Sequence, residues 1–496
     1  MSAELRWLAL IALPLAAAAT TLLARTSGAH ADAARARRGV SRAHALLILT
    51  SLATSGLALA QTLTPASPRW LGGLLRGDVV AQLFAPVLNL IFLGISVYVR
   101  GRGPGAGDAA STRAKRRFTA LSLIFLAGAN LVVISNHLLL TWLALEATTL
   151  AAAVLIAHAE GAAARLASWR YLLFSSIGLG LALLGLGCLA RSMAAQGVPP
   201  TLLLDALPAA LAAPPDPWRQ LGVALVLLGL GTKLGLAPMY SWLPEAYDEA
   251  PAAVTAMLGA VQFNCTLIFL LHVVQVYRPQ SGALITGALL TIGVTSVAVS
   301  TVSIVATRSF KRLLAYASIN HAGVIAIGLG LGETASFGLL LYVLSNAFIK
   351  AILFLTAGKI ESHYGTKDTA SITGLIKDLP YSGLYLMVAT FALLGFPPFG
   401  SFLGELLILS ALVTSGQLFV FGAFCVMITI TFVATGRTIF PMIWAEPRVA
   451  RTWPRQRLRD GLHKLIFLLA LLVLGVYLPP QLNALMTEAA AMLGGR

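Results

Sequence analysis

Apolar runs long enough to cross a membrane recur from one end of this 496-residue chain to the other. A helix needs about 20 predominantly apolar residues to span the hydrocarbon core of a bilayer. Hydrophobic residues make up 58% of the chain and charged residues 11%, whereas soluble domains carry about 25% charged residues. Since no long polar region interrupts the runs, we expect a single membrane domain over residues 1–496 with an all-α, polytopic fold.

The runs predict about fourteen transmembrane helices. The first run, from Leu5 to Ala24, is interpreted as a span and not as a signal peptide, because only Arg6 precedes its apolar part. The expected spans cover residues 6–24, 44–61, 78–99, 118–135, 138–157, 169–190, 220–238, 252–276, 282–306, 313–331, 336–357, 382–412, 417–441 and 462–480.

The 35 Lys and Arg residues are concentrated in alternate loops between these spans. Loops that retain positive charge face the cytoplasm, so we expect a multi-pass protein of the inner (cytoplasmic) membrane with both termini on the non-cytoplasmic side. Membrane orientation also explains the net charge of +16, which therefore does not indicate binding of nucleic acid. Six loops hold 25 of the basic residues, namely 25–43, 100–117, 158–170, 308–312, 359–377 and 445–464.

Sequence signals for cofactor chemistry are absent. Cys188, Cys265 and Cys425 each stand alone in an apolar run, and no Cys/His spacing typical of a metal site occurs. The sequence also has no Walker loop, no dinucleotide-binding glycine motif after a strand and no nucleophile-elbow serine. We therefore expect no cofactor, no metal site and no catalytic centre in the chain, so that the energy for any work comes from outside it.

Charged side chains nevertheless occur within the apolar runs. On insertion scales a charge near the bilayer centre costs roughly 2.5–3.5 kcal/mol, so such residues usually mark ion pathways. The alternatives are a static ion pair that fixes helix packing, or a lysine that snorkels to the interface. His321 lies in a predicted span and titrates near neutral pH, although a packing role fits equally well; His272, near a span end, is expected at the interface. The four charged residues are Glu146, Lys233, Lys350 and Glu405.

Two glycine–proline segments interrupt predicted helices beside these charges. Gly235-Leu-Ala-Pro238 and Gly395-Phe-Pro-Pro-Phe-Gly400 predict broken helices near 235–250 and 395–400, because proline removes a backbone hydrogen bond from a helix. Interrupted helices in corresponding halves of a transporter indicate an inverted repeat with an ion site near the membrane midplane. Ordinary proline-kinked packing is the alternative.

Four segments of the chain resemble one family, the antiporter-like (proton-conducting) membrane subunits of complex I and related complexes. They are the lysine-bearing segment 231–251, the Lys-Arg-Leu-Leu-Ala-Tyr segment 311–321, the segment 346–355 and the broken-helix segment 395–405. Within the family, residues 142–150 and the Asn264-Cys265 pair look most like the F component of hydrogenase-4. That subunit belongs to membrane-bound nickel–iron hydrogenases of the formate hydrogenlyase type.

The resemblance implies an architecture and a set of partners. We expect two inverted repeats, with a first antiporter-like half at 118–276, a second at 282–443, and peripheral helices at 6–99 and 462–480. The implied partners are other membrane subunits and a soluble redox arm of the same complex. The chain itself would perform no electron transfer, and any enzymatic activity would belong to the complex.

For the buried charges, the resemblance implies a proton relay. In relatives, the acid that matches Glu146 pairs with the lysine that matches Lys233. The route would then continue through Lys350 to an exit-side site at Glu405. Apart from the resemblance, titration near neutral pH would allow His321 to bridge the two halves.

The sequence departs from the family pattern at three places. Gly259 stands where relatives often have a histidine, which leaves Gln262 and Asn264 as the nearby polar groups. Asn346 replaces another frequent histidine, and no acid precedes Lys311 where one is usual. These departures leave a non-conducting structural subunit open. A complex I core subunit, a multi-subunit cation/proton antiporter and transport of Na⁺ in place of H⁺ also stay open.

Overall fold

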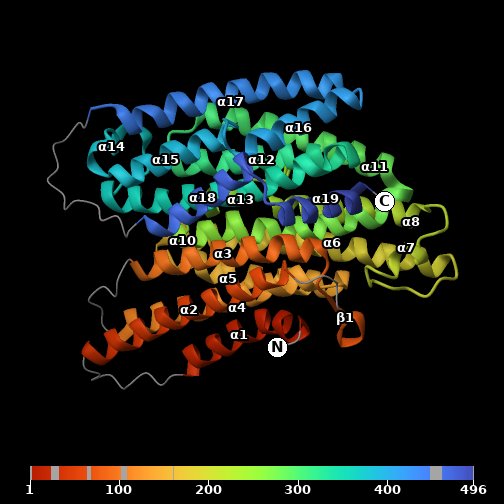
Figure 1. The fold of residues 1–496 in the computed structure, drawn as a ribbon, viewed down its shortest axis with the longest axis horizontal. Helices are drawn as coiled ribbons and strands as arrows, with labels where there is room; N and C mark the ends of the chain where they lie inside the picture. Colours follow the sequence, from red (N-terminus) through yellow and green to blue (C-terminus); the bar gives the residue numbers. More distant parts are fainter. Residues whose placement is uncertain are drawn as a thin grey trace.

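A computed structural model of the chain describes residues 3–23, 33–63, 69–101, 109–159, 161–446 and 461–494. Within these residues the only strands are the two-residue pair β1 (Arg69–Trp70) and β2 (Leu75–Arg76), and helices dominate. The long helices lie side by side and run roughly along one direction (Figure 1). The predicted all-α polytopic membrane fold is therefore confirmed.

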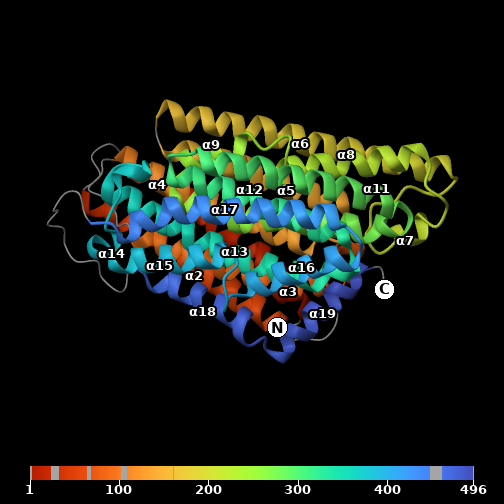
Figure 2. The same ribbon diagram turned by 90° about the horizontal axis from the view of Figure 1, so that it is seen from above.

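The helices follow one another without domain-sized interruptions. In the turned view, α6 lies along one edge of the molecule and α18 and α19 lie at the opposite edge (Figure 2). The α-helices are α1 (Ala3–Leu23), α2 (Ala33–Gln61), α3 (Val79–Gly101), α4 (Ala109–Ile134), α5 (Leu138–Ile156), α6 (Ala162–Ala195), α7 (Leu207–Ala210), α8 (Pro217–Leu234), α9 (Trp242–Glu249), α10 (Ala252–Ala256), α11 (Phe263–Ala306), α12 (Phe310–Leu331), α13 (Glu333–Tyr364), α14 (Leu375–Asp378), α15 (Pro380–Leu393), α16 (Gly400–Thr414), α17 (Leu418–Trp444), α18 (Leu462–Val476) and α19 (Pro480–Gly494). Four short helical turns are η1 (Leu71–Gly73), η2 (Ala157–Ala159), the π-helical η3 (Met257–Gln262) and η4 (Thr369–Ser371).

In the described part of the chain, ten helices are long and apolar enough to cross a membrane, or eleven with the bent pair α18–α19. The predicted count of fourteen is not confirmed. One reason is that the expected spans 252–276 and 282–306 lie in one continuous run that is kinked at Ser281. The run turns back there, since Lys311 just after its end contacts the Ala250 carbonyl just before its start.

The two predicted helix breaks are present, and they share one backbone geometry. Gly235 ends α8 with a φ of 77°, and Gly395 follows α15 with a φ of 67°. In both, the amide of the residue after the glycine donates to a carbonyl five positions back, at 2.8 Å for Leu236 and 3.1 Å for Phe396. Only glycine adopts this left-handed conformation without steric cost, so it closes both helices. The inverted relation of the halves stays a prediction.

Close helix crossings hold the elements around the buried charges. A Cβ at Gly229 of α8 would lie 2.4 Å from the Gly178 carbonyl of α6, so the two backbones are in direct contact, as small residues permit in membrane helices. α13 is the most enclosed helix, with every residue of its most apolar window buried, whereas α17 is largely exposed. The membrane orientation stays a prediction, because both termini and much of the basic loops 25–43, 100–117 and 445–464 lie outside the described residues.

Candidate functional site

Lys233 lies in the last turn of α8, immediately before the first helix break. Its side chain is only 4% exposed. The Nζ atom donates to Thr149 Oγ1 of α5 at 2.6 Å and to the Tyr171 hydroxyl of α6 at 3.1 Å. The ammonium also lies 4.8 Å from the centre of the Tyr171 ring, which adds a cation–π attraction. The lysine is therefore held within the protein and not at the interface.

The Lys233 network continues into the π-helical turn η3. The Tyr171 hydroxyl donates to Gln262 Oε1 at 2.8 Å, and Gln262 Nε2 donates to Thr148 Oγ1 at 3.1 Å. π-Helical turns are rare and frequently occur at functional sites. Gln262 was noted in the sequence only as a nearby polar group, and Tyr171 was missed. The adjacent hydroxyls of Thr148 and Thr149, just after the buried acid on α5, are the signal that indicates a polar network there.

Glu146 lies close to this network but makes no contact ion pair with Lys233 among the described residues. Its Oε1 accepts a hydrogen bond from Ser176 Oγ at 3.3 Å, while its buried Oε2 has no hydrogen-bond partner in the described part. Lys233 Nζ instead donates to the hydroxyl of Thr149, three residues further along α5. The carboxylate is nevertheless near enough for its charge to act on Lys233. The implied direct pairing is therefore not formed in this conformation.

Lys350 occupies the middle of the enclosed helix α13 and is 2% exposed, which contradicts snorkelling to the interface. Its Nζ lies 3.8 Å from the centre of the Phe263 ring and has no hydrogen-bond partner among the described residues. Asn346, one turn earlier, likewise has a buried unpaired Oδ1. Because Phe263 directly follows Gln262, the Lys350 site adjoins the Lys233 network along the η3–α11 segment.

His321 and Glu405 both lie beside the second helix break. Both line a cavity of about 240 Å³ between α12, α15, α16 and α17. The His321 ring forms a hydrogen bond with the Tyr342 hydroxyl of α13, and Lys350 is near enough to act on His321 electrostatically. A Cβ at Gly395 would lie 2.8 Å from Glu405 Oε2, so the glycine leaves room for this carboxylate. Lys233, Lys350 and His321 are buried, whereas Glu146 and Glu405 are half-buried.

Gly259 has a steric explanation. A Cβ there would lie 2.6 Å from Cε2 of Phe354, so the Phe354 ring of α13 occupies the space that a histidine side chain would need. Gln262, one turn further on, supplies the polar group at this level.

No three His, Cys, Asp or Glu side chains in the described residues come together in a way that would hold a metal ion.

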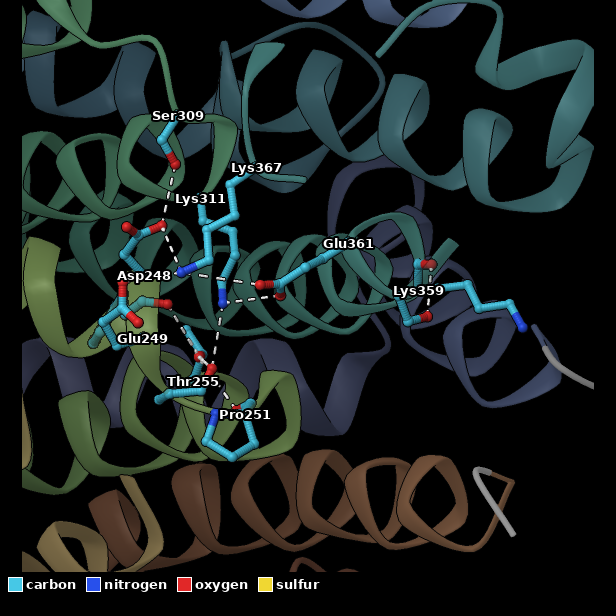
Figure 3. Close-up of polar contacts among 12 residues, drawn as sticks. Asp248, Glu249, Pro251, Thr255, Ser309, Lys311, Lys359, Glu361 and Lys367 are labelled. Atoms are coloured by element: carbon cyan, nitrogen blue, oxygen red, sulfur yellow. Dashed lines mark hydrogen bonds and ion pairs between the residues drawn. The ribbon is translucent and has the colours of Figure 1, made fainter. Parts of the chain in front are cut away.

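A cluster of acidic and basic side chains lies at one end of the molecule. Figure 3 shows its lysines pointing toward its acids. Lys311 is 3% exposed and donates to Glu361 Oε2 of α13 at 3.1 Å and to the Ala250 carbonyl at 3.3 Å. The acid that is missing before Lys311 in the sequence is therefore replaced by one from another helix. We call this group the α9 charge cluster; its members are Asp248, Glu249, Lys311, Arg312, Glu361 and Lys367.

Comparison with known proteins gives consistent results. Residues 135–431, which include Glu146, Lys233, Lys350 and Glu405, match the family described as "NADH:quinone oxidoreductase/Mrp antiporter, TM". The chain is 30% identical over 376 residues to a hydrogenase-4 component F homolog of Methylacidiphilum infernorum, which covers 74% of this chain and 77% of that protein. It is 29% identical over 406 residues to the NADH-quinone oxidoreductase subunit N of Desulforudis audaxviator, covering 77% and 76%. Its fold matches a chain of the Mrp complex from Dietzia sp. with a TM-score of 0.84 at 19% identity, covering 100% and 98%.

Proposed function

Since this chain belongs to the NADH:quinone oxidoreductase/Mrp antiporter family of membrane proteins, we propose that it moves protons across the membrane as one subunit of a redox-driven complex. Protons would pass along a relay of buried ionisable groups, and redox chemistry in partner subunits would supply the energy. The relay residues are Glu146, Lys233, Lys350 and Glu405, with His321 between the last two.

The environment of Lys233 carries this proposal. Its Nζ is buried and held by two hydroxyls, of Thr149 and Tyr171, and by no contact carboxylate among the described residues. Each hydroxyl accepts from Nζ and donates its own proton elsewhere, Thr149 to the Leu145 carbonyl and Tyr171 to Gln262 Oε1. An ammonium has three N–H groups and a neutral amine has two, so either form of the lysine can make both hydrogen bonds. The site therefore accommodates both protonation states, while the nearby Glu146 charge shifts the balance between them. A tight salt bridge would instead favour the charged state alone.

The finer assignment is to a complex of the hydrogenase-4 type. The 30% identity to a hydrogenase-4 component F homolog supports it, and the 29% identity to an NADH-quinone oxidoreductase subunit N supports a complex I core subunit instead. A multi-subunit cation/proton antiporter is the third possibility. Purification of the native complex and identification of its soluble arm separate these cases, because only the first contains nickel–iron hydrogenase subunits.

We further propose an inner-membrane location with both termini on the non-cytoplasmic side.

A structural subunit with a closed pathway is the rival function, and the Phe354 ring beside Gly259 favours it.

The deciding experiment measures redox-driven acidification in vesicles that hold the whole complex. It compares the native complex with the Lys233→Ala variant, and assembly is checked on a native gel. We expect assembly to be retained and pumping to fall by about tenfold or more, as for loss of an acid–base group. Unchanged pumping in an assembled Lys233→Ala complex would leave the chain as a scaffold. Repeating the assay without Na⁺ distinguishes protons from sodium ions.

A further inference from the structure

A second buried titratable pair lies far from the relay, at the start of α3. Asp78 is 7% exposed and His272 of α11 is 2% exposed. Asp78 Oδ2 and His272 Nε2 are 3.4 Å apart. Asp78 also accepts the Ala81 amide at 2.7 Å, so it caps α3. His272 was expected at the membrane interface from its place near a span end; in the structure its side chain is enclosed beside an acid.

The pair opens into a cavity of about 240 Å³ next to the kink of α11, lined by both polar and apolar side chains. Since a water molecule takes up roughly 30 Å³ of liquid volume, the cavity has room for several. Gln275 and Gln280 also line it. Both ring nitrogens of His272 and Gln280 Oε1 are buried and have no hydrogen-bond partner among the described residues, so Nε2 and Asp78 form an ion-pair contact and not a hydrogen bond. A helix cap alone would not require a buried imidazole with a free nitrogen facing polar side chains.

This cavity lies at the opposite end of the molecule from the α9 charge cluster. Arg278, six residues after His272, donates to the Leu329 and Gly330 carbonyls at the end of α12, where α13 is about to begin. α13 then runs to Glu361 in the α9 charge cluster at its other end. A helix of this length, with a rise of about 1.5 Å per residue, spans a bilayer core. The Asp78–His272 pair and the α9 charge cluster are therefore on opposite sides of the membrane.

Buried polar groups also follow α3 inward from Asp78. Gln82, Asn89 and Ser96 come four, eleven and eighteen residues after Asp78, spacings that keep them near one face of a helix. They are buried, and Asn89 Nδ2 donates to Asn130 Oδ1 of α4 at 2.8 Å. α3 in turn packs against η3, the segment that carries Gln262 of the Lys233 network.

We propose that Asp78 and His272 form a proton-exchange site that connects the buried relay of the first half with the aqueous phase at this end of the molecule. The proposal rests on the proton translocation proposed above. In each passage the imidazole takes up one proton and becomes cationic beside the Asp78 carboxylate. It then gives up one proton on the other side, and no electron moves.

The surrounding charges suit such a role. The Asp78 carboxylate accepts the Ala81 amide at 2.7 Å and lies 3.4 Å from His272, and both contacts favour its ionised form. The carboxylate is therefore ionised when His272 is protonated. Arg76, which also lines the cavity, pairs with Asp205, and Asp205 is shared with Arg69 at 2.9 Å. Asp78 is thus the acid that faces His272.

The test compares Asp78→Asn and His272→Gln in the whole complex in vesicles. Asparagine caps helices as well as aspartate, so Asp78→Asn removes the charge and keeps the cap. We expect both variants to assemble and transfer electrons, and to pump about tenfold fewer protons per electron, as for loss of a proton-transfer group. The matched control is Asp216→Asn, the same change at the cap of α8, where no histidine faces the acid. The control should pump normally.

The outcomes separate this proposal from the proposed function. Normal pumping by Asp78→Asn and His272→Gln, with Lys233→Ala inactive in the same assay, overturns the Asp78–His272 site alone. Normal pumping by Lys233→Ala overturns the proposed function first. If Asp78→Asn fails to assemble, His272→Gln decides the matter. Failure of both variants to assemble would show a structural pair and would also overturn the site.

Discussion

At the scale of single residues, the Tyr171 hydroxyl is the link between Lys233 and Gln262. Tyr171→Phe keeps the ring but removes both hydrogen bonds, and a buried polar group left unpaired costs about 1–3 kcal/mol. We therefore expect Tyr171→Phe to assemble and to pump several-fold more slowly per electron transferred in vesicles. The control is Tyr277→Phe, because Tyr277 is equally buried and its hydroxyl has no hydrogen-bond partner among the described residues. Equal pumping by the two variants would contradict a proton path through Tyr171.

The sequence alone identifies the ionisable residues of the candidate site, but it does not identify the side chains that contact them. Lys233 and Lys350 are identifiable because a charge in an apolar run is costly, whatever the surrounding helices do. The contact partner of Lys233 is a threonine and not Glu146, since the packing of α5, α6 and α8 decides which side chain lies within reach. The Phe354 ring that replaces a side chain at Gly259 comes from α13, and no local pattern indicates it.

At the scale of elements, the first helix break depends on Gly235. Its φ of 77° is unfavourable for other residues, and a Cβ there would lie 2.3 Å from Cδ1 of Leu243 in α9. We expect Gly235→Ala to lower the free energy of unfolding in detergent by about 2–3 kcal/mol, the sum of backbone strain and overpacking. Gly416→Ala isolates the strain, because Gly416 has a φ of 72° and open space around it. An equal loss in both variants would show that α8 and α9 do not pack tightly at the break.

The positions of most helices and both breaks follow from hydropathy and from glycine–proline patterns, which are local properties. The span count does not, because hydropathy reports how apolar a segment is and not whether a helix continues through a kink. The run from α10 to α11 shows the difficulty, since it is one largely helical segment of 55 residues that nevertheless turns back at Ser281, as the two expected spans there require. The π-helical turn η3 also escapes prediction: its sequence Met257–Gln262 carries no proline, and its shape depends on the helices around it.

At the scale of the whole molecule, the α9 charge cluster joins the two predicted halves. Asp248, at the end of α9 in the first half, accepts from Arg312 Nε of α12 in the second half at 3.1 Å. The Asp248 side chain is 7% exposed, whereas the acid and base of the Glu245–Arg170 pair, which also involves α9, are 33% and 45% exposed. The two arginines are about equally exposed, 47% for Arg312 and 45% for Arg170, so the pairs differ mainly in how far the carboxylate is sheltered.

A double-mutant cycle on each pair measures its coupling energy from urea unfolding of the subunit in detergent. We expect about 1–2 kcal/mol for Asp248→Asn with Arg312→Gln, because a sheltered carboxylate interacts more strongly with its partner. For Glu245→Gln with Arg170→Gln we expect about 0.2–1 kcal/mol, since exposed pairs are screened by water and salt. Added salt should reduce the second value more than the first. If the Asp248–Arg312 coupling is no larger than the exposed one, the cluster does not hold α9 against α12.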